Sequence, residues 1–223
     1  MMQLFFLKIF PLAIDRFSTL INGVLNMEFV LDRHFFYICR RKYAVSMEHR
    51  KLKVTELNRI SVEEFKEARK LPLVIVLDNV RSLHNIGSVF RTSDAFRIEC
   101  IYLCGITATP PHPEMHKTAL GAEFTVDWKY VDNTVEAVDK LKSDGYVVYS
   151  VEQAEGSIML DELTLDKERK YAVVMGNEVK GVQQEVIDHS DGCIEIPQYG
   201  TKHSLNVSVT AGIVIWDLFK KLA

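Results

Sequence analysis

The feature that most constrains the fold is an alternation of short apolar runs with segments of helical periodicity. Residues 73–77 form a continuous run of apolar and β-branched side chains, which is typical of a strand buried on both faces. Further strands are predicted over residues 101–103, 124–126, 146–151, 171–175 and 193–196. Because strands that alternate with helices usually form a mainly parallel sheet, we expect an α/β fold with helices on both faces.

Helical segments are predicted between these strands. Ser61 and Glu64 form a capping box, which predicts a helix over residues 62–69. Apolar spacing predicts further helices from residue 84 or 85, over residues 115–122, before Gly145, around Val186, and over residues 205–222 with Ser204 as the N-cap. Ligands of parallel α/β sheets bind outside the carboxyl ends of the strands, so polar residues that follow the strands are the candidate site.

Composition excludes little. The 223 residues are 48% hydrophobic and 26% charged, as in ordinary globular proteins, and the net charge of −3 gives no global attraction to nucleic acid. Residues 40–70 hold ten Lys/Arg against five Glu, which fits either a polyanion-binding patch or a solvated helix face. The four cysteines form no CxxC pair, so a reducing, cytoplasmic setting is expected.

The N-terminal region divides from the rest of the chain. Residues 4–14 are apolar but are interrupted by Lys8 and Pro11, and they are shorter than the ~20 residues of a membrane span. Met47 begins a stretch that resembles the start of an ordinary chain. We therefore expect residues 1–46 to be an extension or a product of start-site choice, residues 47–70 to be a short basic helical segment, and residues 71–223 to be the α/β domain.

Several common site types do not fit. The first strand is not followed by GxGxxG, and residues 176–181 lack the Lys and Ser/Thr that complete a phosphate-binding loop. No Gly-x-Ser-x-Gly elbow of a hydrolase is present. His112 and His116 have a zinc-like spacing, but the Glu between them is misplaced and no further ligand cluster accompanies them, so no metal site is expected.

Three polar stretches follow predicted strand ends. They are Asn85-Ile-Gly-Ser-Val-Phe-Arg91-Thr, Met175-Gly-Asn-Glu-Val-Lys-Gly181, and Ile196-Pro197 with Ser204-Leu-Asn-Val-Ser208. In this order they resemble the motifs of the SpoU (TrmH-like) family of RNA ribose methyltransferases, within the knotted SPOUT superfamily. The resemblance covers residues 71 to the C-terminus. It implies a C-terminal trefoil knot, which hydrophobic patterns do not predict because chain-connection rules disfavour knots.

The resemblance also implies a cofactor, S-adenosyl-L-methionine, bound largely by backbone groups of the knotted loops. By motif alignment these loops hold Gly176, Ile196 and Leu205, with Ser150 expected on the loop after the strand at residues 146–151. A glycine suits such a loop because the ligand can approach a backbone that has no Cβ.

The implied reaction is methyl transfer to a ribose 2′-hydroxyl. The family assigns activation of this hydroxyl to the arginine of the first motif, here Arg91. Since arginine is a poor base, we expect it to act with an RNA phosphate or to stabilise the developing alkoxide. Asn85, Glu178, Ser204 and Asn206 match the other catalytic positions and are expected to orient Arg91, ribose and cofactor.

Structural alternatives remain for three of these catalytic positions. Arg91 could pair with Asp94 on the helix surface, Glu178 could form a loop salt bridge, and Asn206 could contact the first helical turn. Gln198 stands where the family would place Met after Ile196-Pro197, which could alter the pocket wall.

The implied partners are RNA and a second copy of the chain. Family members dimerise through the long C-terminal helix, although burial of its apolar face within one subunit would give the same pattern. No membrane contact is expected. The substrate predicted from the short layout is transfer RNA; the alternatives are ribosomal RNA or a relative that binds RNA without catalysis.

Overall fold

The computed structural model describes residues 49–223, and the predictions for residues 1–46 lie outside this part of the chain. Residues 49–57 and 58–223 fall into two separate units. The first contains a short 3-10 helix, η1 (Val54–Glu56), and an ion pair in which Arg50 Nη2 lies 2.9 Å from Glu56 Oε1. The second unit contains the sheet and all the motifs.

The sheet of the second unit has seven strands in the order β3-β2-β1-β6-β4-β7-β5, and every neighbouring pair is parallel. The strands are β1 (Leu71–Asp78), β2 (Ile98–Cys104), β3 (Trp128–Val131), β4 (Tyr146–Val151), β5 (Ile158–Met159), β6 (Lys170–Met175) and β7 (Gly192–Glu195). The prediction of a parallel α/β sheet is confirmed. All loops that follow strands therefore leave from the same edge of the sheet.

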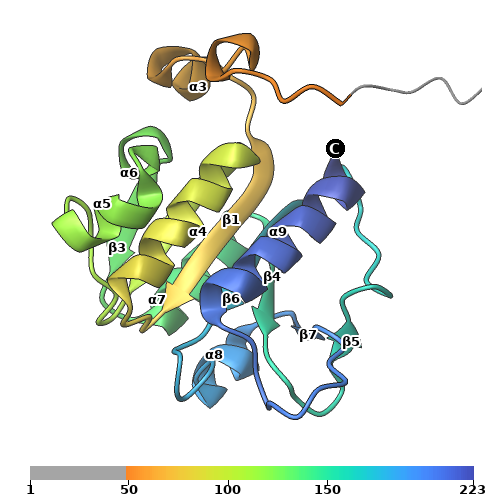
Figure 1. Ribbon diagram of the computed structural model, residues 1–223. Coiled ribbons are helices and arrows are strands. Elements are labelled where there is room, and N and C mark those ends of the chain that lie inside the picture. Colours follow the sequence, from red (N-terminus) through yellow and green to blue (C-terminus); the bar gives the residue numbers. More distant parts are fainter. Residues whose placement is uncertain (1–48) are drawn as a thin grey trace, which may run out of the picture. The chain divides into compact units, whose positions relative to one another are not determined.

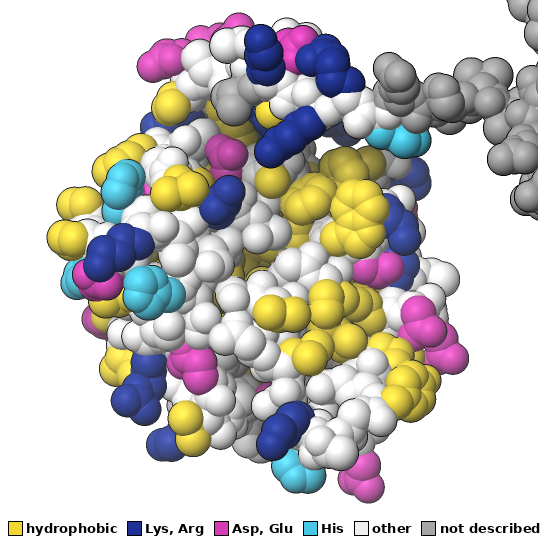
Figure 2. All heavy atoms as spheres, viewed as in Figure 1, with side chains coloured by type: hydrophobic (Ala, Val, Ile, Leu, Met, Phe, Trp, Pro, Cys, Tyr) yellow, Lys and Arg dark blue, Asp and Glu magenta, His cyan; other side chains and the backbone are white. Residues whose placement is uncertain are grey.

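Helices cover both faces of this sheet. They are α3 (Val62–Glu67), α4 (Leu83–Ala95), α5 (Pro113–Ala119), α6 (Ala122–Thr125), α7 (Thr134–Ser143), α8 (Gln184–His189) and α9 (Val207–Leu222). Figure 1 shows α4 and α9 side by side on one face, with their first turns at the edge where β1 ends. In the space-filling view of this face, hydrophobic side chains gather over α9 (Figure 2).

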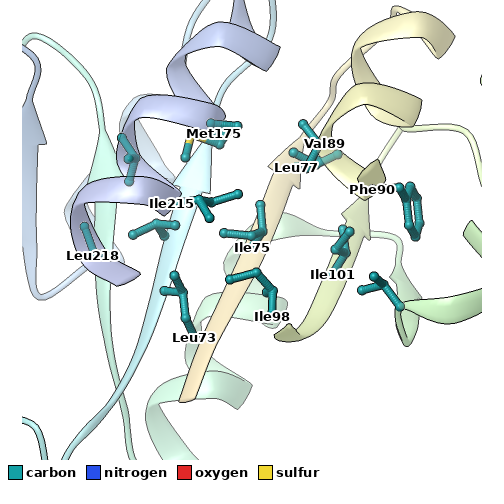
Figure 3. Close-up of a cluster of buried hydrophobic side chains, with 14 of the residues drawn as sticks. Leu73, Ile75, Leu77, Val89, Phe90, Ile98, Ile101, Met175, Ile215 and Leu218 are labelled. Atoms are coloured by element: carbon teal, nitrogen blue, oxygen red, sulfur yellow. The ribbon is translucent and has the colours of Figure 1, made fainter. Parts of the chain in front are cut away.

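The central strand β1 is buried on both faces, as its apolar run predicts. Leu73, Ile75 and Leu77 pack in one core with residues of β2, α4 and α9, while Val74 and Val76 pack in a second core with α7 and α8. Figure 3 shows the first of these cores between the sheet and the two helices. This burial fixes α4 and α9 against the strands whose ends carry the motifs.

Some predicted elements are wrong. Residues 124–126 were expected to form a strand, but helix α6 occupies Ala122–Thr125 and strand β3 begins at Trp128. Leu120 and Gly121, both with positive φ, end α5 and start this new helical turn. Such a short apolar run does not distinguish a strand from a buried helical turn. The two-residue strand β5 was also not predicted.

The ends of two helices also differ from prediction. Helix α3 has the expected capping box of Ser61 and Glu64 but ends at Glu67. The N-cap of α9 is Asn206 rather than Ser204, because Asn206 Oδ1 accepts the backbone N–H of Ser208 at 2.9 Å. Both Ser and Asn are good N-cap residues, so the sequence alone does not choose between them.

The second unit begins at Asn58, and Phe65 of α3 is buried in the same core as β1. The division of the chain at residues 46 and 70 stays a prediction. The trefoil knot stays a prediction from the family resemblance. Within residues 49–223, no helix is long and apolar enough to cross a membrane.

Candidate active site

The first and second motifs meet at the carboxyl edge of the sheet through the carboxylate of Glu178. Its Oε2 accepts the backbone N–H of Arg81 at 3.0 Å, and its Oε1 accepts the backbone N–H of Ser82 at 2.9 Å and Asn85 Nδ2 at 3.0 Å. Glu178 follows β6 and its three donors follow β1, so the sheet brings together residues nearly one hundred positions apart in the chain. No ion pair joins Glu178 to a cation within residues 49–223, contrary to the structural alternative.

The pKa of Glu178 is lowered. Desolvation by burial raises it, but the donors from Arg81, Ser82 and Asn85 outweigh this effect. Hydrogen bonds to the charged form of a carboxyl group favour ionisation. The site therefore holds a fixed negative charge at neutral pH.

Asn85 extends this hydrogen-bonded chain to the third motif. Asn206 Nδ2 donates to Asn85 Oδ1 at 3.1 Å, and Asn206 Oδ1 accepts both the N–H and the Oγ–H of Ser208, at 2.9 and 2.6 Å. Asn206 thus caps α9 and reaches α4 at the same time. The contact of Asn206 with the first helical turn and its predicted place in the site therefore hold together.

The loop after β6 is built by close backbone packing. Asn177 and Gly181 form a two-residue antiparallel bridge, and Asn177 Nδ2 donates to the carbonyl of Asn79 at 2.7 Å. A Cβ added to Gly176 would collide with the backbone of Gly181 and Val182. Gly176 is therefore required by the loop itself, in addition to any ligand that approaches it.

Asp78, at the end of β1, anchors this loop and was missed by sequence reasoning. It is fully buried, its Oδ1 accepts Thr134 Oγ1 at 2.6 Å and Gln183 Nε2 at 2.9 Å, and its Oδ2 accepts the N–H of Gln183 at 3.1 Å. Gln183 lies two residues after the second motif. The sequence carried one signal of this role, because Asp78 directly follows the apolar run of a buried strand and a buried carboxylate requires partners.

A cavity of about 860 Å³ opens beside the hydrogen-bonded chain. Five predicted site residues line it: Gly176, Glu178, Ile196, Ser204 and Leu205. Gln198, which replaces the expected Met, also lines it.

Ser150 does not line this cavity. It is fully buried within β4, and its hydroxyl forms a hydrogen bond with Ser190 Oγ at 2.9 Å. Strand β4 has the bounds predicted from the sequence, so Ser150 lies inside the strand and not on the loop where the family resemblance places it. Glu152 and Gln153, which follow the strand, line the cavity instead.

Known proteins match the part of the chain that carries this site. The model of the SpoU rRNA Methylase family matches residues 72–216, more than half of the chain. The chain belongs to the SpoU methylase family. Against TrmH-family tRNA/rRNA methyltransferases of Staphylococcus aureus it is 30% identical over 160 residues, covering 72% of this chain and 63% of theirs. It therefore spans less than two thirds of the length of these relatives.

Three further likenesses are to RNA-modifying enzymes. The chain is 30% identical over 162 residues to the tRNA (guanosine(18)-2′-O)-methyltransferase of Aquifex aeolicus, covering 70% of this chain and 72% of that one. The crystal structure of the A. aeolicus TrmH/SpoU tRNA modifying enzyme matches with a TM-score of 0.63, over 72% of this chain and 80% of that one at 29% identity. An AdoMet-bound rRNA methyltransferase of Sinorhizobium meliloti also matches with a TM-score of 0.63, at 26% identity over 71% of this chain and 60% of that one.

Arg91 lies on the exposed surface of α4, outside the cavity lining. It is six residues after Asn85, which places it about 9 Å further along the helix axis. Within residues 49–223 its guanidinium makes no hydrogen bond or ion pair, and the pairing with Asp94 considered as an alternative does not form. The charge of Arg91 is thus available to a ligand.

His112, His116, Cys100 and Cys104 have structural surroundings that explain them. His112 Nδ1 caps α5, His116 contacts the buried Glu123, and residues 49–223 contain no group of three or more metal-ligating side chains. Burial raises the pKa of the Cys100 thiol to about 11 and that of the Cys104 thiol to about 12. These thiols are protonated and unreactive at neutral pH.

Proposed function

We propose that this protein is an S-adenosylmethionine-dependent RNA methyltransferase that methylates a ribose 2′-hydroxyl in transfer RNA. The observation that carries the proposal is the hydrogen-bonded chain Asn206–Asn85–Glu178, which joins all three SpoU motifs at the mouth of a cavity. Family membership supports the same reading. A polar chain with every member paired is a rigid frame suited to orienting a reactant.

The cavity has the chemistry to hold the proposed cofactor. Its carboxylates, from Glu152, Glu155, Glu178, Asp188 and Glu195, outnumber its one lysine, Lys180, and suit a ligand with a sulfonium and an ammonium group. We assign cofactor contacts to Gly176, Ile196 and Leu205, with Glu152 and Gln153 in place of Ser150. When bound, the cofactor supplies an electrophilic methyl group.

Arg91 is the proposed catalytic residue. A ribose hydroxyl is a weak acid, so its oxygen gains negative charge as its proton leaves. The positive charge of the Arg91 guanidinium stabilises this oxygen or holds the phosphate beside it. Ser204, at the cavity wall, and the frame of Asn85, Glu178 and Asn206 orient the ribose.

A homodimer through α9 forms part of the proposal. Leu205 precedes this helix, and Val209, Ile213 and Trp216 follow on it at helical spacing; each is 38% to 50% exposed. The opposite face of α9, which includes Ala211, Val214 and Leu218, is already buried in the core. A second apolar stripe on one helix is typical of a subunit interface.

Two alternatives remain for the substrate and activity. Ribosomal RNA is supported by the likeness to the S. meliloti rRNA methyltransferase. A relative that binds RNA without catalysis is disfavoured, because the paired frame and the uncommitted Arg91 are both retained. The buried cysteines fit our further proposal of a cytoplasmic location.

The test is transfer of a labelled methyl group from S-adenosylmethionine to unmodified transfer-RNA and ribosomal-RNA pools. Label in 2′-O-methyl nucleotides of transfer RNA is expected with the parent and not with Arg91→Ala. Label confined to ribosomal RNA would select the first alternative. Cofactor binding with no label in either pool would contradict the enzymatic proposal.

A further inference from the structure

Three loops at the carboxyl edge of the sheet each carry one exposed cation. Arg81 follows β1, Lys180 follows β6 and Lys202 follows β7. Within residues 49–223 none of these three side chains forms an ion pair or hydrogen bond. Cations that remain unpaired on converging loops are available to a polyanion.

The backbones of these three loops are fixed by the site itself. Arg81 donates its N–H to Glu178 at 3.0 Å, and Lys180 donates its N–H to Asn177 Oδ1 at 3.1 Å. The loop of Lys202 is tied to the loop after β4 by Gln153 Nε2, which donates to the carbonyl of His203 at 2.8 Å. The three charges are therefore attached to a frame that exists before any ligand binds, which lowers the entropy cost of binding.

Tyr199 stands out on the third of these loops. It is 98% exposed, the highest value among the large hydrophobic side chains of the described residues. It lies between Gln198 and His203, which both line the cavity. A ring in this position contributes almost no burial to folding, so its stabilising role in the free protein is small.

An aromatic ring together with several separate positive charges is the set of groups that binds unpaired RNA. Single-stranded segments are bound by phosphate contacts to Lys and Arg together with stacking of bases on aromatic side chains. A protein partner would instead favour a continuous apolar patch, such as the exposed stripe of α9. The side chains at the cavity mouth therefore suit a nucleic acid strand as the ligand.

We propose that Arg81, Lys180 and Lys202 hold phosphates on either side of the target nucleotide, and that Tyr199 stacks on a neighbouring unpaired base. The inference rests on the proposed function and narrows its substrate to nucleotides in single-stranded or loop RNA. A base within a duplex is already stacked on its neighbours and offers Tyr199 no free face.

The stacking contact is tested with Tyr199→Ala and Tyr199→Phe. Phe keeps the ring, so RNA affinity should stay within about twofold of the parent, whereas Ala should weaken it about fivefold or more. The KM for RNA should rise with no change in the KM for S-adenosylmethionine. Tyr130→Ala is the matched control, since Tyr130 is 47% exposed on β3, outside these loops, and its loss should leave RNA binding unchanged.

The phosphate contacts are tested by the salt dependence of RNA binding. The triple variant Arg81→Ala, Lys180→Ala, Lys202→Ala should reduce the slope of log K against log salt by about 2, since each single-strand phosphate contact contributes about 0.7. The control carries Lys167→Ala, Arg169→Ala and Lys170→Ala. These cations lie at the opposite, amino end of β6, and their loss removes the same charge.

The outcomes separate this inference from the proposed function. If the parent methylates RNA but Tyr199→Ala binds it normally, or both triple variants lower the slope equally, the inference is overturned and the function stands. If the parent methylates no RNA, yet binding depends on Tyr199 and on the three loop cations, the inference holds and the enzymatic proposal fails.

Discussion

Asn206 and Asn85 lie 121 positions apart in the chain, yet Asn206 Nδ2 donates to Asn85 Oδ1 at 3.1 Å. The bond joins the first residue before α9 to the first turn of α4 and, through Asn85, to Glu178. It orients both amides, because each amide oxygen and nitrogen has a defined partner. The relative position of the first and third motifs depends on it.

Asn206→Asp tests this bond with little change in shape. Aspartate caps helices as well as asparagine, so α9 should form normally, but a carboxylate cannot donate to Asn85 Oδ1. We expect a loss of about 1 kcal/mol in unfolding free energy and a fall of about tenfold or more in methylation rate. Denaturant titration and single-turnover kinetics measure the two effects. Asn133→Asp, at the N-cap of α7, is the control and should behave like the parent.

Arg91→Ala separates catalysis from stability. Since the Arg91 guanidinium has no partner within residues 49–223, we expect the melting temperature to change little, whereas kcat should fall by about 100-fold or more. Arg91→Lys should recover little, because a lysine does not reproduce the planar guanidinium fork. Arg69→Ala, at another exposed arginine, should leave both quantities unchanged. Normal turnover in Arg91→Ala would remove this residue from the mechanism.

Gly176→Ala tests the packing of the loop after β6. The added Cβ has no room beside the backbone of Gly181 and Val182, so the loop must move and the cavity wall with it. We expect the affinity for S-adenosylmethionine to fall by about tenfold or more, as measured by calorimetry. Gly200→Ala is the control, because nothing lies near its Cβ position. Equal affinities in the two variants would show that the loop tolerates displacement.

The lowered pKa of Glu178 predicts that the stability of the protein depends on pH. Its pKa is lowered in the folded state, because the three donors outweigh the opposing desolvation, so its stabilisation is present above the ordinary pKa of about 4.5 and is lost as pH falls below it. Glu178→Gln should therefore be less stable than the parent at pH 7, by less than ~1 kcal/mol because the group is exposed. The difference should shrink toward pH 3. Urea titrations at several pH values measure it, and a constant difference would contradict the assignment.

The exposed stripe of α9 predicts the oligomeric state. Ile213→Glu together with Trp216→Glu places two charges in the proposed interface, which should convert a dimer to a monomer in sedimentation experiments. Methylation should fall in parallel if the interface completes the site. Tyr130→Glu, at an exposed aromatic residue of β3, should not change the mass. A parent protein that sediments as a monomer would refute the dimer.

The sequence by itself determined the α/β class and the place of the site. The apolar run of β1 is buried on both faces because parallel strands lie between two layers of helices, and this local pattern is visible without a structure. The motifs follow strand ends, and parallel strands bring such ends to one edge. Gly176, Glu178, Ile196, Ser204 and Leu205 reach the cavity for that reason.

The tertiary structure decided what depends on contacts between distant segments. The link from the cap of α9 to the first motif depends on Asn85, 121 positions before Asn206, and the role of Asp78 depends on Gln183, 105 positions later. Local periodicity carries no information about such partners, because the free energy of each contact exists only once the sheet has brought both residues together.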